Sequence, residues 1–317
     1  MSQTLHPKLL RSLHTLPEDH SRAQPHVSAA SGLVMLESSG NWHGYFVADD
    51  EHHLGHVVLG NEAPVELLRI LPGDLPNDAK KRKKAKPDLE CLMALPPMPG
   101  HAHGALLTLG SGSKEQRHAG LLMPLNAQGL LPADVEGAAK QLNLTELYAP
   151  LHNAFDDLNI EGCFLQGEHV HLLQRGNKGE SGSACIRFDA AQFQTWLIDE
   201  RVSAPVPQHI FKIDLGNVNG IPLTPTDGIG LPDGRWLLSA AAENTGDSVT
   251  DGPCAGSALA LLDSKGDVLA LHLLEGAPKV EGIALVMKGN ATQVLMVTDA
   301  DDPTLASQLL SLDAFWL

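Results

Sequence analysis

Apolar and polar residues alternate along most of the chain in short runs, and one arrangement of these runs occurs five times. In each repeat a small or acidic residue opens an apolar strand, a second apolar strand ends in polar residues, and a third strand follows a loop. The five openings read Ala30-Ser31-Gly32-Leu33, Leu89-Glu90-Cys91-Leu92, Ile160-Glu161-Gly162-Cys163, Thr226-Asp227-Gly228-Ile229 and Val280-Glu281-Gly282-Ile283. Period-two alternation bounded by Gly and Asp turns favours strands over helices. A fixed repeat of three or four strands is typical of a β-propeller.

The strands of each blade can be assigned by residue range. In the first repeat we expect inner, middle, third and outer strands at residues 27–36, 44–48, 54–59 and 65–71. The inner, middle and third strands of the later repeats are expected at 88–95, 105–109 and 119–125; at 159–165, 169–174 and 183–188; at 225–231, 235–240 and 257–262; and at 279–287, 293–297 and 307–312.

The repeats are longer than those of a compact propeller. The equivalent positions 31, 90, 161, 227 and 281 are separated by 59, 71, 66 and 54 residues, against about 40 to 45 for a compact blade. Insertions are therefore expected between the strands. Two of them, residues 144–155 and 190–198, are predicted to be helices on the outside of the ring.

The fold class predicted from these patterns is all-β, with one β-propeller domain of five blades over residues 1–317. Residues 8–16 are apolar and have no blade of their own, whereas the last repeat has no residues left for an outer strand. We expect this N-terminal segment to complete the last blade, which would close the ring and remove an open sheet edge. Six blades are the alternative if residues 130–151 form a degenerate blade.

Composition narrows the classes of partner. The formal net charge of −16 would repel a polyanion, so nucleic acid is not expected as the main partner. No apolar run reaches the roughly 18 to 20 residues of a membrane span, and residues 1–16 lack the apolar core of a secretory signal. The four cysteines form no CxxC pair, which favours a reducing cytoplasm over a disulfide framework or a zinc site.

Two further groups of residues bear on the chemistry. The only dense basic run, Lys80-Lys81-Arg82-Lys83-Lys84-Ala85-Lys86, is predicted to be a solvated loop; an anion-recruiting arm and a localisation or nucleic-acid signal are the alternatives. The sixteen histidines show no zinc-ligand spacing and are expected in exposed loops. Neither a serine-hydrolase elbow nor a phosphate-binding loop motif occurs in the sequence.

An acidic ring is the main candidate site. Glu90, Glu161, Asp227 and Glu281 occupy the opening position of four repeats, and Ser31 occupies it in the first. Two unit charges 4 Å apart repel by roughly 4 kcal/mol at an effective dielectric of about 20, so converging carboxylates need compensation. A divalent cation, most readily Ca²⁺, an internal Arg175 or Lys279, or protonation of one carboxyl would each supply it. The structural alternative is that each carboxylate accepts backbone hydrogen bonds from the next blade.

A second group of polar residues follows the middle strands. Its segments are Asp49-Asp50-Glu51-His52-His53, Ser111-Gly112-Ser113, Arg175-Gly176-Asn177, Glu243-Asn244-Thr245 and Asp299-Ala300-Asp301-Asp302. Depending on strand length, this group lies beside the acidic ring or at the opposite face. Arg175 suits bidentate binding of a carboxylate or phosphate, or neutralisation of the ring. Asp299 belongs to an oxygen-rich segment that suits a cation loop or an ordinary turn.

The long loop over residues 243–256 is a candidate lid. It is long enough to fold over one end of the channel, although a passive surface loop fits the same residues. The pattern alone leaves both interpretations open.

Several of these motifs together resemble a known group of proteins. Asn159-Ile160-Glu161-Gly162 with the later Gln174-Arg175-Gly176-Asn177 is similar to an uncharacterised family of bacterial cytoplasmic β-propellers, as are Thr226-Asp227 with Ala242-Glu243-Asn244 and Val280-Glu281-Gly282 with Thr298-Asp299. The resemblance spans residues 27–312 and extends more distantly to phytase-like and esterase-like propellers. It implies either carboxylate-bound Ca²⁺ that polarises phosphate or one central metal with Glu, Asn and Asp ligands.

The predicted function follows from the acidic pocket. We expect a cytoplasmic propeller that binds a divalent cation at Glu90, Glu161, Asp227, Glu281 and Asp299, and a small anionic ligand. If it is an enzyme, metal-assisted hydrolysis of a phosphoester, ester or lactone is expected, with Arg175 holding the anion and Glu161 or Glu243 as base. The alternative is a non-catalytic binding or scaffold protein in which the acidic ring joins the blades. Substrate and oligomeric state are not specified by the sequence.

Overall fold

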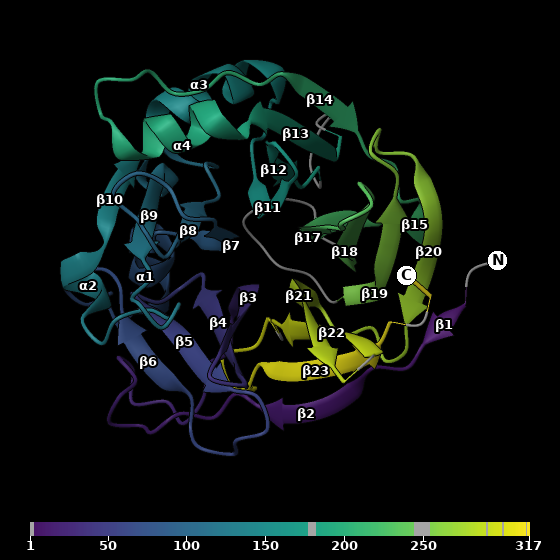
Figure 1. The fold of residues 1–317 in the computed structure, drawn as a ribbon. Coiled ribbons are helices and arrows are strands. Elements are labelled where there is room, and N and C mark those ends of the chain that lie inside the picture. The colour runs from purple at the N-terminus through teal and green to yellow at the C-terminus, as the bar shows by residue number, and fades with distance from the viewer. Residues whose placement is uncertain (1–2, 177–181, 244–253, 290, 300, 315) are drawn as a thin grey trace.

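Five sheets surround a central axis (Figure 1) in the computed structural model, which describes residues 3–317 except 177–181, 244–253, 290, 300 and 315. The innermost strands are β3 (Ala30–Ser38), β7 (Leu89–Leu95), β11 (Ile160–Gln166), β17 (Thr224–Gly230) and β21 (Val280–Lys288). Each inner strand contacts the inner strands of both neighbouring sheets. The ring is therefore closed, and the prediction of an all-β, five-bladed propeller is confirmed.

Antiparallel partners continue each blade outward from its inner strand. Blade one continues with β4 (Asn41–Ala48), β5 (His53–Val58) and β6 (Glu66–Arg69), and blade two with β8 (Ala105–Gly110), β9 (Ala119–Pro124) and β10 (Lys140–Asn143). Blade three continues with β12 (His169–Gln174), β13 (Ala184–Asp189) and β14 (His209–Lys212), and blade four with β18 (Trp236–Glu243), β19 (Cys254–Leu262) and β20 (Val268–Leu274). Blade five continues with β22 (Ala291–Thr298) and β23 (Gln308–Asp313). A small hairpin of β15 (Asn217–Val218) and β16 (Ile221–Pro222) precedes blade four.

The N-terminal segment closes the ring. Strand β2 (Lys8–Ser12) pairs antiparallel with β23 and forms the outer strand of blade five, as predicted. Strand β1 (Thr4–Leu5), which the sequence did not indicate, pairs in parallel with β20 at the outer edge of blade four. The Arg11 guanidinium also donates to the carbonyls of Asn61 and Ala63, at 2.8 and 2.7 Å, in blade one. This segment therefore joins three blades.

The predicted helices lie at the periphery of the ring (Figure 1). Helix α3 (Thr145–Ala154) and helix α4 (Ala190–Ile198) match the predicted ranges, and Asp189 caps α4 by accepting from the Gln192 N–H at 2.9 Å. Residues 130–151 contain α2 (Val135–Ala138), the outer strand β10 and the first part of α3. They complete blade two, so the six-blade alternative is wrong.

The basic run departs from the prediction of a loop. Residues Ala79–Ala85 form helix α1, and a short 3₁₀ helix, η1, follows β8 at Glu115–Arg117. Asp78 caps α1 by accepting from the Lys81 N–H at 2.9 Å, and lysine and arginine are good helix formers. Arg82 is buried and pairs with Glu51 at 2.8 Å. Within the described part of the chain, no helix is long and apolar enough to cross a membrane.

A β-bulge interrupts the pairing at the opening of every inner strand. The register to the middle strand shifts between Ser31 and Leu33, Leu89 and Cys91, Ile160 and Gly162, Pro225 and Asp227, and Val280 and Gly282. The extra residues are Gly32, Glu90, Glu161, Thr226 and Glu281. A bulge frees one residue from the regular alternation and re-aims its side chain. The five similar openings in the sequence are therefore five bulges at one end of the ring.

Candidate functional site

The inner-strand openings and the middle-strand ends meet at one end of the axis. They pair across each hairpin, for example Ile160 with Gln174 and Val280 with Thr298, because the two strands are antiparallel. The two predicted groups of polar residues therefore lie beside each other rather than on opposite faces. We call this region the charged end; its ionisable residues are Asp49, Lys86, Asp88, Glu90, Arg117, Glu161, Arg175, Glu243, Lys279, Glu281, Asp299 and Asp301.

Arg175 lies at the centre of the charged end. Its guanidinium pairs with Glu243 at 2.8 Å, Glu161 at 3.4 Å and Glu281 at 3.7 Å. The remaining donor, Nε, donates to Thr224 Oγ1 at 3.1 Å. These contacts come from blades three, four and five. The arginine therefore neutralises carboxylates of the chain itself.

Lys279 is the second cation of this group. Its Nζ lies 2.7 Å from Glu243, 3.3 Å from Glu281, 3.4 Å from Asp299 and 2.5 Å from Asp301. Together with Glu161, five carboxylates thus surround the two cations Arg175 and Lys279. Not all five can be ionised without an excess of buried negative charge.

The carboxyl groups of this network differ in their pKa values. Burial raises the pKa of Glu161 and Glu281 above the ordinary value, although Arg175 and Lys279 oppose the shift. Burial and the neighbouring Asp299 raise the pKa of Asp301 to about 8. For Glu243, burial acts in the same direction, but Arg175 and Lys279 outweigh it and lower the pKa. Ionised Glu243 therefore lies among carboxyl groups that tend to hold a proton.

Blades one and two contribute a second cluster, formed by Asp49, Asp88 and Glu90. One carboxylate oxygen of each lies within 4.8 Å of the others. Lys86 pairs with Asp49 and, at 2.8 Å, with Asp88, whose other oxygen lies 2.7 Å from Arg117. The three carboxylates are suitable ligands for a divalent cation. The Lys86 ammonium already supplies a positive charge beside two of them.

Glu90 differs from its neighbours in the surroundings of its carboxyl group. None of the described residues forms a hydrogen bond or ion pair with its carboxyl group, which is partly accessible to solvent. Burial, and then the charges of Asp88 and Glu161, raise its pKa well above the ordinary value. The site thus presents a partly buried carboxyl group with a raised pKa.

Asp227 has a different environment from the other predicted ligands. In blade four the bulged residue is Thr226, so Asp227 is one position out of the register of Glu90, Glu161 and Glu281. Its Oδ2 accepts from the Ile283 N–H of blade five at 2.8 Å, and no described cation pairs with it. Burial raises its pKa. This geometry is the backbone-bonded arrangement that the sequence left open as the structural alternative.

The structure brings together most of the predicted site residues. Glu161, Arg175, Glu243, Glu281 and Asp299 form the ionic network, Glu90 lies in the adjacent cluster, and Ser31 donates to the Glu90 carbonyl at 2.5 Å. The sequence did not indicate Lys86, Asp88 or Arg117 as site residues. Asp88 could have been found from its position two residues before Glu90. Asn177, Asn244, Thr245 and residues 244–253 of the candidate lid lie outside the described residues.

Solved structures share this fold at low sequence identity. An α-L-arabinofuranosidase from Podospora anserina aligns with a TM-score of 0.53 and 10% identity, covering 98% of this chain and 96% of that one. An α-L-arabinanase from Cellvibrio cellulosa aligns with a TM-score of 0.48 and 10% identity, covering 90% and 92%. The similarity to the arabinofuranosidase concerns the fold alone. None of the curated proteins compared with the sequence matches it.

The sequence itself matches a family model over residues 82–303, which is more than half of the chain. The match begins within helix α1 and ends after strand β22, so it includes most residues of the charged end. The chain belongs to the family of unknown function DUF6910.

Proposed function

We propose that the charged end is a hydrolytic centre that cleaves a glycosidic bond in a small polar substrate by carboxyl acid–base chemistry. The observation that carries the proposal is Glu90, a partly accessible carboxyl group with a raised pKa and no described partner. A general acid needs its proton at working pH and a free path to the leaving group.

Asp49 is the best candidate for the nucleophile. One of its oxygens lies within 4.8 Å of a Glu90 oxygen, and the Lys86 ammonium pairs with it. In the proposed reaction Glu90 gives its proton to the glycosidic oxygen as the C–O bond breaks. Two carboxyl groups this close leave no room for a water between them, so Asp49 attacks the sugar carbon as the nucleophile and forms a covalent bond to the sugar. Glu90, now ionised, then takes a proton from the water that breaks this bond and releases the sugar and the Asp49 carboxylate. Arg175 and Lys279 position Glu161 and Glu243 around the substrate.

The carboxyl pair suits a glycosidic bond because that bond breaks only when its leaving oxygen is protonated. The arabinofuranosidase with the same fold supplies a reasonable first substrate, although its similarity to this chain shows the fold alone. A substrate screen should therefore include p-nitrophenyl arabinofuranosides, other glycosides, an ester and a phosphoester.

The test is the variant Glu90→Gln in that screen. We expect kcat to fall by about 10²- to 10⁴-fold, the range for loss of a general acid, with an unchanged melting temperature. Activity of the wild type should decline at high pH as Glu90 loses its proton. Glu37→Gln, an exposed carboxyl of the neighbouring blade, is the matched control and should be active. Full activity of Glu90→Gln would refute the proposal.

A divalent cation at Asp49, Asp88 and Glu90 is the second candidate function, favoured by the 4.8 Å cluster. The ion would take the place of the Lys86 ammonium and polarise the oxygen of a phosphoester, ester or lactone. Ca²⁺ at about 100 times its Kd stabilises the folded state by about 2.7 kcal/mol. A rise in melting temperature that Glu90→Gln abolishes would support this function. No shift with Ca²⁺, Mg²⁺ or Mn²⁺ would exclude it.

The scaffold alternative predicts a different pair of results. If the network only joins the blades, Glu161→Gln should lower the melting temperature strongly, and no substrate in the screen should be turned over by the wild type. A hydrolytic centre predicts turnover in the wild type. The backbone contacts of Asp227 support a structural role for that one carboxyl.

A further inference from the structure

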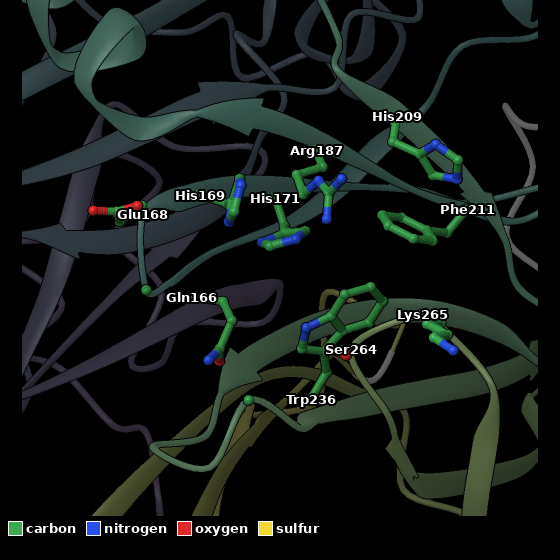
Figure 2. A pocket seen from close by; sticks show the side chains of 12 residues that line it. Gln166, Glu168, His169, His171, Arg187, His209, Phe211, Trp236, Ser264 and Lys265 are labelled. Atoms are coloured by element: carbon green, nitrogen blue, oxygen red, sulfur yellow. The ribbon is translucent and has the colours of Figure 1, made fainter.

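A cavity of about 770 Å³ opens between blades three and four (Figure 2). It is lined in part by the turn after β11, the turn before β18 and the turn before β20. These turns lie at the opposite end of the blades from the inner-strand openings. The cavity is therefore separate from the charged end, and a ligand bound in it is independent of the function proposed for that end.

Several buried polar atoms in this cavity have no partner. His171 and Trp236 are each only 1% exposed, yet neither ring nitrogen of His171 nor Nε1 of Trp236 is hydrogen-bonded within the described residues. The same holds for Oε1 of Gln166 and Nε of Arg187. In Figure 2 the side chains of His171, Arg187 and Trp236 point into the same space from the two blades.

Such atoms are costly to bury. A buried donor or acceptor without a partner has lost its hydrogen bonds to water and gained none in return, so each one in a native protein requires an explanation. Five in one cavity indicate partners that come from outside the chain. Burial lowers the pKa of His171 to about 3, so its ring is neutral and offers one donor and one acceptor.

The charge of the cavity selects an anion. The Arg187 guanidinium stacks over Phe211 at 5.1 Å, and no described carboxylate pairs with it or with Lys265 at the rim. Glu168, the acidic residue in the lining, pairs with neither. Arg187 is therefore a half-buried cation without a described carboxylate partner, in a chain whose net charge is −16. A planar guanidinium matches a carboxylate through two parallel hydrogen bonds.

The walls of the cavity select a ring. Trp236 packs edge-on against Phe211 at 5.4 Å, and His209 lies 4.2 Å from the same ring. His171 lies 5.0 Å from Trp236. Aromatic walls with a few convergent polar groups are typical of small-molecule sites, and they pack against an aromatic ring or the C–H face of a sugar.

We propose that this cavity binds a small carboxylate that carries a ring, with Arg187 and Lys265 holding the carboxylate and Phe211 contacting the ring. Trp236 and Gln166 supply a donor and an acceptor for polar groups on the ring. An aromatic acid and a sugar acid share this chemistry, so benzoate and D-glucuronate serve as the two probes.

Isothermal titration calorimetry on the full chain tests the proposal. At least one probe should bind saturably, and its neutral counterpart, benzyl alcohol or D-glucose, should bind at least about tenfold more weakly. Arg187→Met should lower the affinity for the probe that binds by about 10- to 100-fold, which is the effect of losing a hydrogen bond to a charged group. Arg201→Met, an exposed arginine paired with Asp199, is the control and should bind like the wild type.

Three results would overturn the proposal. The first result is that neither probe binds saturably, which would mean that water alone fills the cavity. Another is inorganic phosphate binding as tightly as the carboxylates, which would make the ring irrelevant. The third is an unchanged affinity in folded Arg187→Met. If that variant does not fold, Arg187→Lys keeps the charge and loses the planar fork, and unaltered affinity there would equally contradict the carboxylate geometry.

Discussion

Replacing Arg175 by methionine tests the ionic network directly. The guanidinium lies 2.8, 3.4 and 3.7 Å from Glu243, Glu161 and Glu281, and all four residues are buried. Methionine keeps most of the side-chain volume and removes the charge. Breaking a buried pair on one side costs about 3–5 kcal/mol. Lys279 still neutralises Glu243 and Glu281, so we expect a loss of about 3 kcal/mol, the lower end of that range.

The loss should depend on pH in a defined direction. Without Arg175 the pKa values of Glu161 and Glu281 rise further, so the folded state binds protons that the unfolded state releases. When the pKa of a carboxyl group is higher in the folded state, the protein loses stability as pH rises above the group's pKa in the unfolded state, which is about 4.3 for glutamate. Arg175→Met should therefore lose less stability at pH 5 than at pH 8.

Urea denaturation at the two pH values measures both effects. Arg201→Met serves as control because its ion pair with Asp199 is exposed, and we expect its stability within about 0.5 kcal/mol of the wild type. A loss below about 1 kcal/mol in Arg175→Met, or an equal loss at pH 5 and pH 8, would refute the network as described.

Three further predictions concern stability. Asp227→Asn retains an oxygen that accepts from the Ile283 N–H, whereas Asp227→Ala leaves this donor unsatisfied, which costs about 1–3 kcal/mol of stability. The alanine variant should therefore lose more stability in chemical denaturation than the asparagine variant, and equal losses would be inconsistent with this contact. Burial raises the pKa of Glu281, and burial together with Asp299 raises the pKa of Asp301 to about 8. The wild type should therefore have a larger free energy of unfolding at pH 5 than at pH 8.5, and a free energy that does not change with pH would contradict these raised pKa values. Deleting residues 1–12 removes β1 and β2 and exposes the β23 edge, so light scattering should show aggregation; a monomeric, equally stable product would disprove closure by this segment.

The strands and their order could be predicted because hydrophobic alternation and turn residues act locally. Strand β2 could be predicted as well, since a closed ring requires an outer strand that the last repeat lacks. Strand β1 was not predictable because two residues carry no periodicity. Helix α1 could not be predicted from an apolar face, because its buried residue, Arg82, is held by ion pairs and is not apolar.

The site was predictable only in part. The repeated opening located Glu90, Glu161 and Glu281, because bulges recur at similar places in related hairpins. A bulge displaced by one residue in blade four changed the role of Asp227, and sequence spacing does not report that shift. The pairing of Lys86 with Asp49 joins residues 37 positions apart, which only the folded ring brings together.

The most direct test of the central claim is the protonation state of Glu90. In protein labelled with ¹³C at glutamate side-chain carboxyl carbons, the resonance that disappears in Glu90→Gln can be followed by NMR as pH is raised. We predict that the pKa of this carboxyl group lies well above the ordinary value of 4.5. Titration at or below 4.5 would contradict its role as the acid of the charged end.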